Sequence, residues 1–182
     1  AVLIAAGVGV TPMLAMLRQI VFEGKRRRAA RSTWFIHVDK SRKSRAFHDE
    51  IGELVRAAEG AVRYVAVHTA PASGEREGID YSYTGRFHAA DLSRFLPFGD
   101  YDFYMCGPSG FMQATYDGLR AIGVADARVH AEAFGPSSLT RTRDEGSAAP
   151  SVPVSTASVP VLFAASSKEA RWEPGSGTLL DL

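Results

Sequence analysis

The sequence predicts an α/β fold built on a doubly wound parallel sheet, and three features of residues 1–135 lead to this expectation. Apolar runs of strand length alternate with stretches of helical periodicity. Several of these runs are apolar throughout, as is typical of strands that are covered on both faces. Glycine-containing motifs follow strands, which is where an open α/β sheet binds its ligands. We therefore expect a five-stranded parallel sheet in the order 3-2-1-4-5, with helices on both faces.

The strands and helices of this domain follow from the apolar pattern. The expected strands are Ala1–Ala6, Thr33–Val38, Val62–His68, Tyr101–Cys106 and Arg128–Phe134. The expected helices are Pro12–Glu23, Arg45–Ala58, Ala89–Phe95 and Ser109–Ile122. Gly24 stands where the first helix is expected to end. Because each helix joins two strands of one parallel sheet, the crossovers should be right-handed.

Composition and charge exclude several classes of function. The 182 residues include 21 basic and 20 acidic side chains, a net charge of +1, so the basic excess typical of nucleic-acid or anionic-membrane binders is absent. No apolar stretch reaches the roughly 18 residues of a membrane span, and Ala1–Ala6 lacks the basic flank of a signal peptide. Cys106 is the single cysteine, which excludes an internal disulfide and a multi-cysteine metal site. We predict no metal ligands and a cytoplasmic location.

Beyond residue 135 the composition changes. Residues 136–158 are rich in Ser, Thr, Ala and Pro, which is typical of a linker. Residues 159–182 predict two further strands, Val159–Ala165 and Ala170–Trp172, and the start of a helix at Thr178–Leu182. A segment of this length cannot bury a core alone, and the sequence begins directly at a core strand. We therefore expect a fragment that is truncated at both ends.

A glycine-rich motif follows the first strand: Gly7-Val8-Gly9-Val10-Thr11-Pro12. Gly7 and Gly9 would let the backbone turn sharply and approach a ligand closely. Thr11 would serve as the helix N-cap and Pro12 as the first helical residue. The free N–H groups of such a helix start suit a phosphate. A tight turn that binds nothing is the alternative.

A second motif, Cys106-Gly107-Pro108, ends the fourth strand. Gly107 and Pro108 predict a sharp turn at the carboxyl edge of the sheet, from which the Cys106 sulfur would point toward the ligand. The alternative is a buried cysteine that acts as a small hydrophobic residue. Neither a His nor a Lys adjoins Cys106, so we expect it to pack and position rather than to act as a nucleophile.

The segment after the second strand offers Ser41, Arg42 and Arg45 where the adenine ribose of a bound nucleotide would lie. Ser and Arg side chains suit a 2′-phosphate, whereas an acidic residue such as Asp39 would bind a 2′-hydroxyl. The balance leans toward NADP(H) over NAD(H). The alternative is a charged loop that caps the next helix.

Together, the Gly7–Pro12 and Cys106–Pro108 motifs resemble those of ferredoxin–NADP⁺ reductase-like enzymes, and the resemblance covers nearly all of residues 1–135. It implies that the first motif binds the pyrophosphate and that the second lines the nicotinamide site. Glu132-Ala133-Phe134 resembles the segment of that family near the nicotinamide and flavin, so Cys106 and Glu132 are expected at the reacting end and Phe134 beside the cofactor. Arg86 follows a glycine as in the family, and would contact the nucleotide or cap the next helix.

The resemblance also implies a function. A flavin domain carrying FAD or FMN precedes this domain in the family, takes hydride from NAD(P)H and passes electrons onward. Residues 159–182 resemble the opening of a plant-type [2Fe–2S] ferredoxin domain, although no cysteine follows Cys106 to hold a cluster. The expected partners are these two domains of the parent protein and a downstream electron acceptor such as an oxygenase. The alternative is a module that binds NAD(P) for sensing or structure without redox chemistry.

Overall fold

The computed structural model describes residues 1–134, 139–142, 144, 156–164 and 166–177. The chain divides into two compact units, Ala1–Asp144 and Glu145–Leu182, which are described separately. Among the described residues, none of the helices combines the length and the apolar composition that a membrane span requires.

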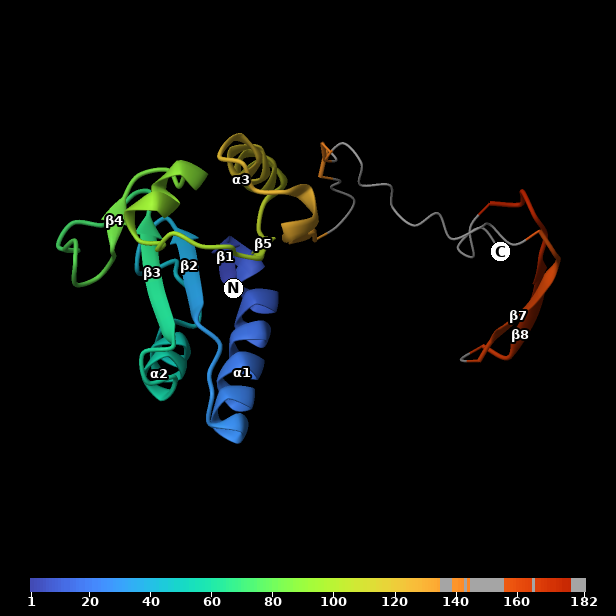
Figure 1. Cartoon of the computed structure of the whole chain (residues 1–182), viewed down its shortest axis with the longest axis horizontal. Coiled ribbons are helices and arrows are strands. Elements are labelled where there is room, and N and C mark those ends of the chain that lie inside the picture. Colours follow the sequence, from blue (N-terminus) through green and yellow to red (C-terminus); the bar gives the residue numbers. More distant parts are fainter. Residues whose placement is uncertain (135–138, 143, 145–155, 165, 178–182) are drawn as a thin grey trace. The chain divides into compact units, whose positions relative to one another are not determined.

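The first unit is built on a parallel sheet of six strands in the order β4-β3-β2-β1-β5-β6, of which Figure 1 labels β1 to β5. The strands are β1 (Val2–Ala6), β2 (Thr33–Asp39), β3 (Val62–His68), β4 (Tyr83–Thr84), β5 (Phe103–Cys106) and β6 (Val129–Glu132). The five expected strands are present in the expected order. The prediction of five strands was nevertheless incomplete, because β4 pairs with β3 over only two residues and is too short to show a periodicity.

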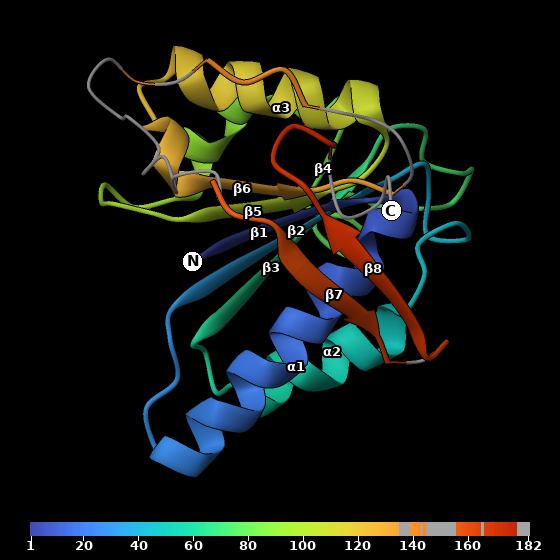
Figure 2. The same cartoon turned by 90° about the vertical axis from the view of Figure 1, so that its right-hand side faces the viewer.

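Helices cover both faces of the sheet, as expected (Figure 2). They are α1 (Val10–Arg27), α2 (His48–Ala57) and α3 (Ser109–Ala121), with short 3₁₀ segments at η1 (Gly7–Gly9), η2 (Ala89–Arg94) and η3 (Asp126–Arg128). Side chains alternate between the faces along each strand. In β1, Leu3 and Ala5 pack with α1 and α2, whereas Val2, Ile4 and Ala6 pack with α3 and η2. Both faces therefore contribute to the core.

The ends of the helices differ from the sequence predictions. α1 extends three residues beyond Gly24, which is buried inside the helix. Glycine is needed there for close packing, since an added Cβ atom would lie 2.8 Å from the Cβ of Ala30. The left-handed backbone of Arg28, with φ at 54°, ends the helix instead. α2 begins three residues later than expected, after Phe47 with φ at 58°. The Ala89–Phe95 segment forms the 3₁₀ segment η2 rather than an α-helix.

The described part of the second unit is an antiparallel hairpin of β7 (Val159–Phe163) and β8 (Lys168–Trp172), with Val161 opposite Ala170. Two strands were expected at these positions. The helix expected at 178–182 lies outside the described residues. The 136–158 linker is described only in part, and the assignment of 159–182 to a ferredoxin-like domain stays a prediction.

Candidate nucleotide-binding site

The carboxyl ends of β1 and β5 meet at the switch point of the sheet, where the chain order reverses. β1 is followed along the chain by β2 and β3 on one side, and it pairs with β5 on the other. Ala5 lies opposite Cys106, and Cys106 lies opposite Glu132. The two sequence motifs therefore leave the sheet from adjacent strands, at the edge where open α/β sheets bind ligands.

The backbones of the two motifs touch through glycines. A Cβ atom on Gly9 would lie 2.0 Å from the Cys106 carbonyl oxygen and 2.6 Å from the Gly107 nitrogen. A Cβ on Gly107 would lie 2.9 Å from Cδ1 of Phe111 and 3.0 Å from the Cβ of Ala6. Real Cβ atoms do not approach backbone so closely, so the contact requires glycine at position 9. The first and second motifs thus form one continuous backbone surface.

Two helices begin at this surface without a capping side chain. Neither α1, which starts at Val10, nor α3, which starts at Ser109, has a side-chain cap or an acidic residue in its first turn. The first turn of α2, by contrast, contains Asp49 and Glu50. Because a helix N-terminus carries partial positive charge and unpaired N–H groups, the starts of α1 and α3 suit an anion.

The expected N-cap role of Thr11 was wrong. The turn Gly7–Gly9 runs directly into α1, so Gly9 takes the N-cap position and Pro12 lies inside the first turn. The Thr11 hydroxyl donates a hydrogen bond to the Val8 carbonyl oxygen over 3.0 Å. Gly7 has φ at +54° and open space around it, and the Val8 side chain is exposed.

The side chain of Cys106 lies in the core, which agrees with the alternative of a small hydrophobic residue and corrects the expectation of a sulfur pointing toward the ligand. Its side chain is fully buried and packs in the core cluster that contains Val10 and Met13 of α1. The reason is strand parity, since Tyr104 and Cys106 face the α1 side and Phe103 and Met105 the other. Burial raises the pKa of the Cys106 thiol, and the nearby Glu132 carboxylate raises it further. The residue therefore packs as a neutral thiol, and its backbone contacts Gly9.

Glu132 and Phe134 end this side of the sheet and are both exposed. Glu132 is the last residue of β6 and Phe134 follows two residues later, with 53% of its surface exposed. An exposed aromatic ring beside a carboxylate is available to a ring-shaped ligand. Their roles at the nicotinamide stay predictions.

The predicted ribose-end residues have different surroundings. Ser41 is half-buried, and its backbone amide donates a hydrogen bond to the Ser44 hydroxyl over 3.1 Å. Arg42 is exposed, and its Nη1 forms an ion pair with Asp80 at 2.9 Å. Arg45 is only 5% exposed, and its guanidinium donates to the Asp80 carbonyl over 2.9 Å. Arg42 and Ser41 thus lie at the surface, whereas Arg45 lies beneath it.

Sequence reasoning missed the residues that hold this loop. Glu75 and Asp80, in the loop after β3, accept hydrogen bonds from the Arg42 amide and the Arg42 side chain. His68, the last residue of β3, contacts both Glu75 and Arg45 through its ring nitrogens. The contacts made by Arg42 and Arg45 join residues 23 to 38 positions apart, so no local sequence pattern indicates them. The one sequence signal for these contacts is that β2 and β3 are neighbours, so the loops that follow them lie side by side at the same edge of the sheet.

Arg86, predicted to contact the nucleotide or to cap a helix, is exposed after β4. The preceding Gly85 has φ at +112°, and its N–H donates to the His68 carbonyl over 3.0 Å. η2 is capped instead by His88, whose amide donates to the Asp91 carboxylate. The helix-capping alternative for Arg86 is therefore wrong, and its contact with a nucleotide stays a prediction.

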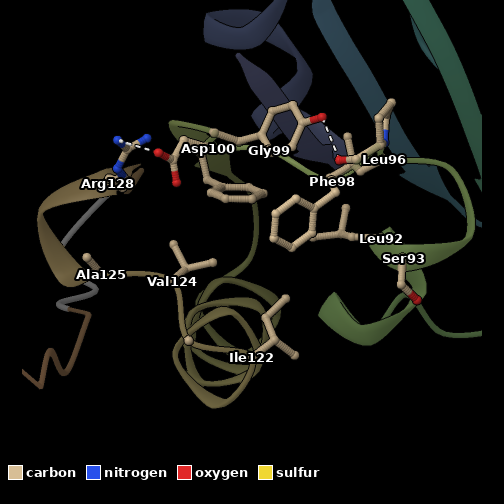
Figure 3. A pocket seen from close by; sticks show the side chains of 14 residues that line it. Leu92, Ser93, Leu96, Phe98, Gly99, Asp100, Ile122, Val124, Ala125 and Arg128 are labelled. Atoms are coloured by element: carbon tan, nitrogen blue, oxygen red, sulfur yellow. Dashed lines mark hydrogen bonds and ion pairs between the residues drawn. The ribbon is translucent and has the colours of Figure 1, made fainter.

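A separate cavity of about 700 Å³ lies at the opposite, amino-terminal edge of the strands (Figure 3). Leu92, Phe98, Ile122 and Val124 surround it, and Arg128 reaches Asp100 at 3.7 Å on its rim. The segments that line it precede β5 and β6. It is therefore distinct from the edge where the two motifs meet.

Comparison with known proteins agrees with this fold. Residues 3–117 match the family described as oxidoreductase NAD-binding domain. The chain is 38% identical over 135 residues to a flavohemoprotein of Chromobacterium violaceum, and 36% identical over 139 residues to flavohemoprotein-2 of Giardia intestinalis. These matches cover 74% of this chain but only 32% and 30% of the relatives. The chain thus spans about a third of the length of the curated relatives it matches.

Solved structures give the same result. The FAD/NAD-binding domain of nitric oxide dioxygenase from Vibrio cholerae matches with a TM-score of 0.60 and 35% identity, over 74% of this chain and 51% of that one. The cytochrome b5 reductase domain of Ulva prolifera nitrate reductase matches at 0.61 with 17% identity, over 72% and 48%, and shows the fold alone.

Fold and site define the class as a dinucleotide-binding domain of the parallel α/β type. The chain belongs to the oxidoreductase NAD-binding domain family, whose structural neighbours here are ferredoxin–NADP⁺ reductase-like proteins.

Proposed function

We propose that this chain binds NAD(P)H at the carboxyl edge of its sheet and presents the nicotinamide to a flavin held by a neighbouring domain. The observation that carries the proposal is the contact of Gly9 with Cys106 and Gly107, which joins the two motifs into one surface. Two uncapped helix starts lie at this surface, and neither has an acidic first turn. This arrangement suits a ligand with two linked phosphates.

Each part of the edge has a role in this proposal. The backbone from Gly7 to Pro12 holds the pyrophosphate, and Gly7 and Gly9 keep side chains out of its way. Cys106, Gly107 and Pro108 form the floor of the nicotinamide site through their backbone. Glu132 and Phe134, which are exposed at the end of β6, flank the ring. The adenine ribose lies over the loop after β2, near Ser41 and Arg42.

A bound nicotinamide would supply a hydride to the flavin, and this chemistry belongs to the two cofactors. The chain contributes orientation, because holding the ring in one position makes the transfer effectively unimolecular. No residue has to act as acid or base in the transfer itself. The neutral, buried thiol of Cys106 fits this proposal because it offers packing and no nucleophile.

The electron acceptor after the flavin has two candidates. An iron–sulfur domain is favoured by the hairpin β7–β8, which lies where the sequence resembles the opening of a ferredoxin. The chain itself does not fit a [2Fe–2S] cluster, since Cys106 is its single cysteine and such clusters use four. A haem is favoured by the names of the relatives, which are flavohemoproteins. The flavin is FAD in a flavohemoglobin of Malassezia yamatoensis, a solved structure 27% identical to this chain.

A chimera tests whether the domain works in hydride transfer or binds nucleotide without redox chemistry. Residues 1–134 replace the matching segment of the Chromobacterium violaceum flavohemoprotein, and the flavin absorbance is followed anaerobically after NADH or NADPH is added. We expect the flavin to be bleached by at least one nucleotide, with the unmodified flavohemoprotein as positive control. A chimera that is folded and flavin-loaded, binds nucleotide and shows no bleaching would support the sensing alternative.

A further inference from the structure

The loops after β2 and β3 are joined by a closed ring of contacts among five residues, which we call the ribose-loop ring: Arg42, Arg45, His68, Glu75 and Asp80. Asp80 pairs with Arg42 through Oδ1 at 2.9 Å. The Glu75 carboxylate accepts from the Arg42 amide over 3.0 Å and contacts Nδ1 of His68 at 2.6 Å. Arg45 completes the ring, since its Nη1 lies 3.2 Å from Nε2 of His68 and 2.9 Å from the Asp80 carbonyl oxygen.

Asp80 is held firmly within this ring. Its second carboxylate oxygen accepts the Arg76 amide over 3.0 Å, and its own amide donates to the Arg76 carbonyl over 2.9 Å. The side chain is 13% exposed, against 56% for Arg42. Hydrogen bonding from the Arg76 amide, together with Arg42, holds the pKa of Asp80 below its ordinary value. The carboxylate is therefore charged at neutral pH, and it cannot turn away without losing its backbone partners.

The ring has consequences for an approaching 2′-phosphate. The two arginines of the ring are matched by its two carboxylates, Glu75 and Asp80. Arg42 is the exposed cation of the ring, and its guanidinium is already paired. A phosphate bound there would lie close to the fixed carboxylate of Asp80, and like charges at that range repel strongly in a partly buried site.

We propose that Asp80, by occupying Arg42, makes this site prefer NAD(H) over NADP(H). This proposal rests on the proposed function, and it reverses the preference that Ser41, Arg42 and Arg45 suggest in the sequence. Asp39, at the end of β2, supplies the kind of carboxylate that binds a ribose 2′-hydroxyl. Asp80 acts as a specificity-determining residue through Arg42 and needs no contact with the nucleotide.

Calorimetric titration of the 182-residue chain with NAD⁺ and NADP⁺ tests this directly. The chain as it stands should bind NAD⁺ at least about tenfold more tightly than NADP⁺. Asp80→Asn keeps the size of the side chain and one of its two acceptor oxygens but removes its charge. This variant should raise the affinity for NADP⁺ relative to NAD⁺ by about tenfold. Arg42→Ala added to Asp80→Asn should remove that gain, because the released cation is then absent.

The matched control is Glu77→Gln, which removes the same charge from an exposed position of the same loop. It should leave the ratio of the two affinities within about twofold of the unmodified chain. If Asp80→Asn leaves the ratio unchanged while NAD⁺ still binds, the inference is overturned and the proposed function stands. A preference of the unmodified chain for NADP⁺ would overturn the inference without any variant. If no chain binds either nucleotide, the proposed function fails and the inference fails with it.

Discussion

At the scale of single residues, His37 shows how burial in the sheet shifts the pKa of an ionisable side chain. Its side chain is fully buried on β2, with Nδ1 3.2 Å from the Tyr64 hydroxyl and Nε2 without a hydrogen-bond partner among the described residues. Burial lowers the pKa of His37 to about 4, partly opposed by the Asp39 carboxylate, and burial raises the pKa of Tyr64 to about 12. Both groups are therefore neutral across the physiological range.

This burial predicts a specific loss of stability in acid. Above pH 6.5 His37 is neutral whether the chain is folded or unfolded, so it adds no pH dependence. Between pH 6.5 and about 4, His37 binds a proton in the unfolded chain but not in the folded chain. The free energy of unfolding therefore falls as the pH falls. The total loss from this group is about 3 kcal/mol. Denaturant unfolding at pH 7.5, 5.5 and 4.5 measures it.

His37→Gln should flatten this pH dependence while lowering stability at pH 7.5. The control is His130→Gln, since His130 is exposed and stacks on Tyr104, with the two ring centroids 4.6 Å apart. That change should leave the slope between pH 6.5 and 4.5 as it is in the unmodified chain. Equal slopes for His37→Gln and the unmodified chain would show that His37 does not titrate as its burial indicates.

At the scale of elements, the turn between β1 and α1 contains two glycines that the structure uses differently. Gly7 adopts φ at +54° with nothing within 4 Å of an added Cβ, whereas an added Cβ on Gly9 would meet the backbone of Cys106 and Gly107. Gly7→Ala should therefore cost about 1 kcal/mol of stability, through backbone strain alone. Gly9→Ala should cost several times as much, because one strand end must move away from the other.

Thermal unfolding and NAD⁺ titration of the two variants compare these costs. We expect Gly7→Ala to keep most of its stability, and Gly9→Ala to show a much lower melting temperature and loss of nucleotide binding. Each variant serves as the control for the other, since both add one methyl group to the same turn. Equal effects would contradict the close approach of the two motifs.

Also at the element scale, the sequence predicts the helices and strands that follow from hydrophobic periodicity. It does not predict the features that depend on contacts between distant residues. The strands and the order of the central sheet follow from continuous apolar runs, which fix strand length and burial. The end of α1 did not follow, because Gly24 looks like a stop and is used instead to pack closely against Ala30. β4 was missed because its pairing with β3 depends on the loop that brings it there.

The same distinction holds for the candidate site. The Gly7–Pro12 and Cys106–Pro108 motifs were identifiable because each is a local string at the end of a strand. The sequence left two positions open for the Cys106 thiol, the ligand edge and the core, and the parity of a four-residue strand decides for the core. Glu75, Asp80 and His68 were missed because their contacts with Arg42 and Arg45 span the sheet edge. The nucleotide preference depends on these long-range contacts, which no motif contains.

At the scale of the whole first unit, Ala1–Asp144 has core residues on both faces of the sheet and two separate surface features at its two edges. The motifs meet at the carboxyl edge, where the starts of α1 and α3 have no cap. The cavity near Phe98 lies at the amino-terminal edge. A nucleotide that bound in this cavity instead of at the motif edge would contradict the proposed binding site.

The most direct test of that account is a map of nucleotide binding on the chain. The amide signals of the isotope-labelled 182-residue chain are followed by NMR during titration with NAD⁺. We predict shifts concentrated at residues 7–11 and 106–109, where the two motifs touch, with further shifts in the loop that contains Arg42. Shifts confined to the cavity around Leu92, Phe98 and Ile122, or the absence of shifts at the motifs when NAD⁺ binds, would contradict the account.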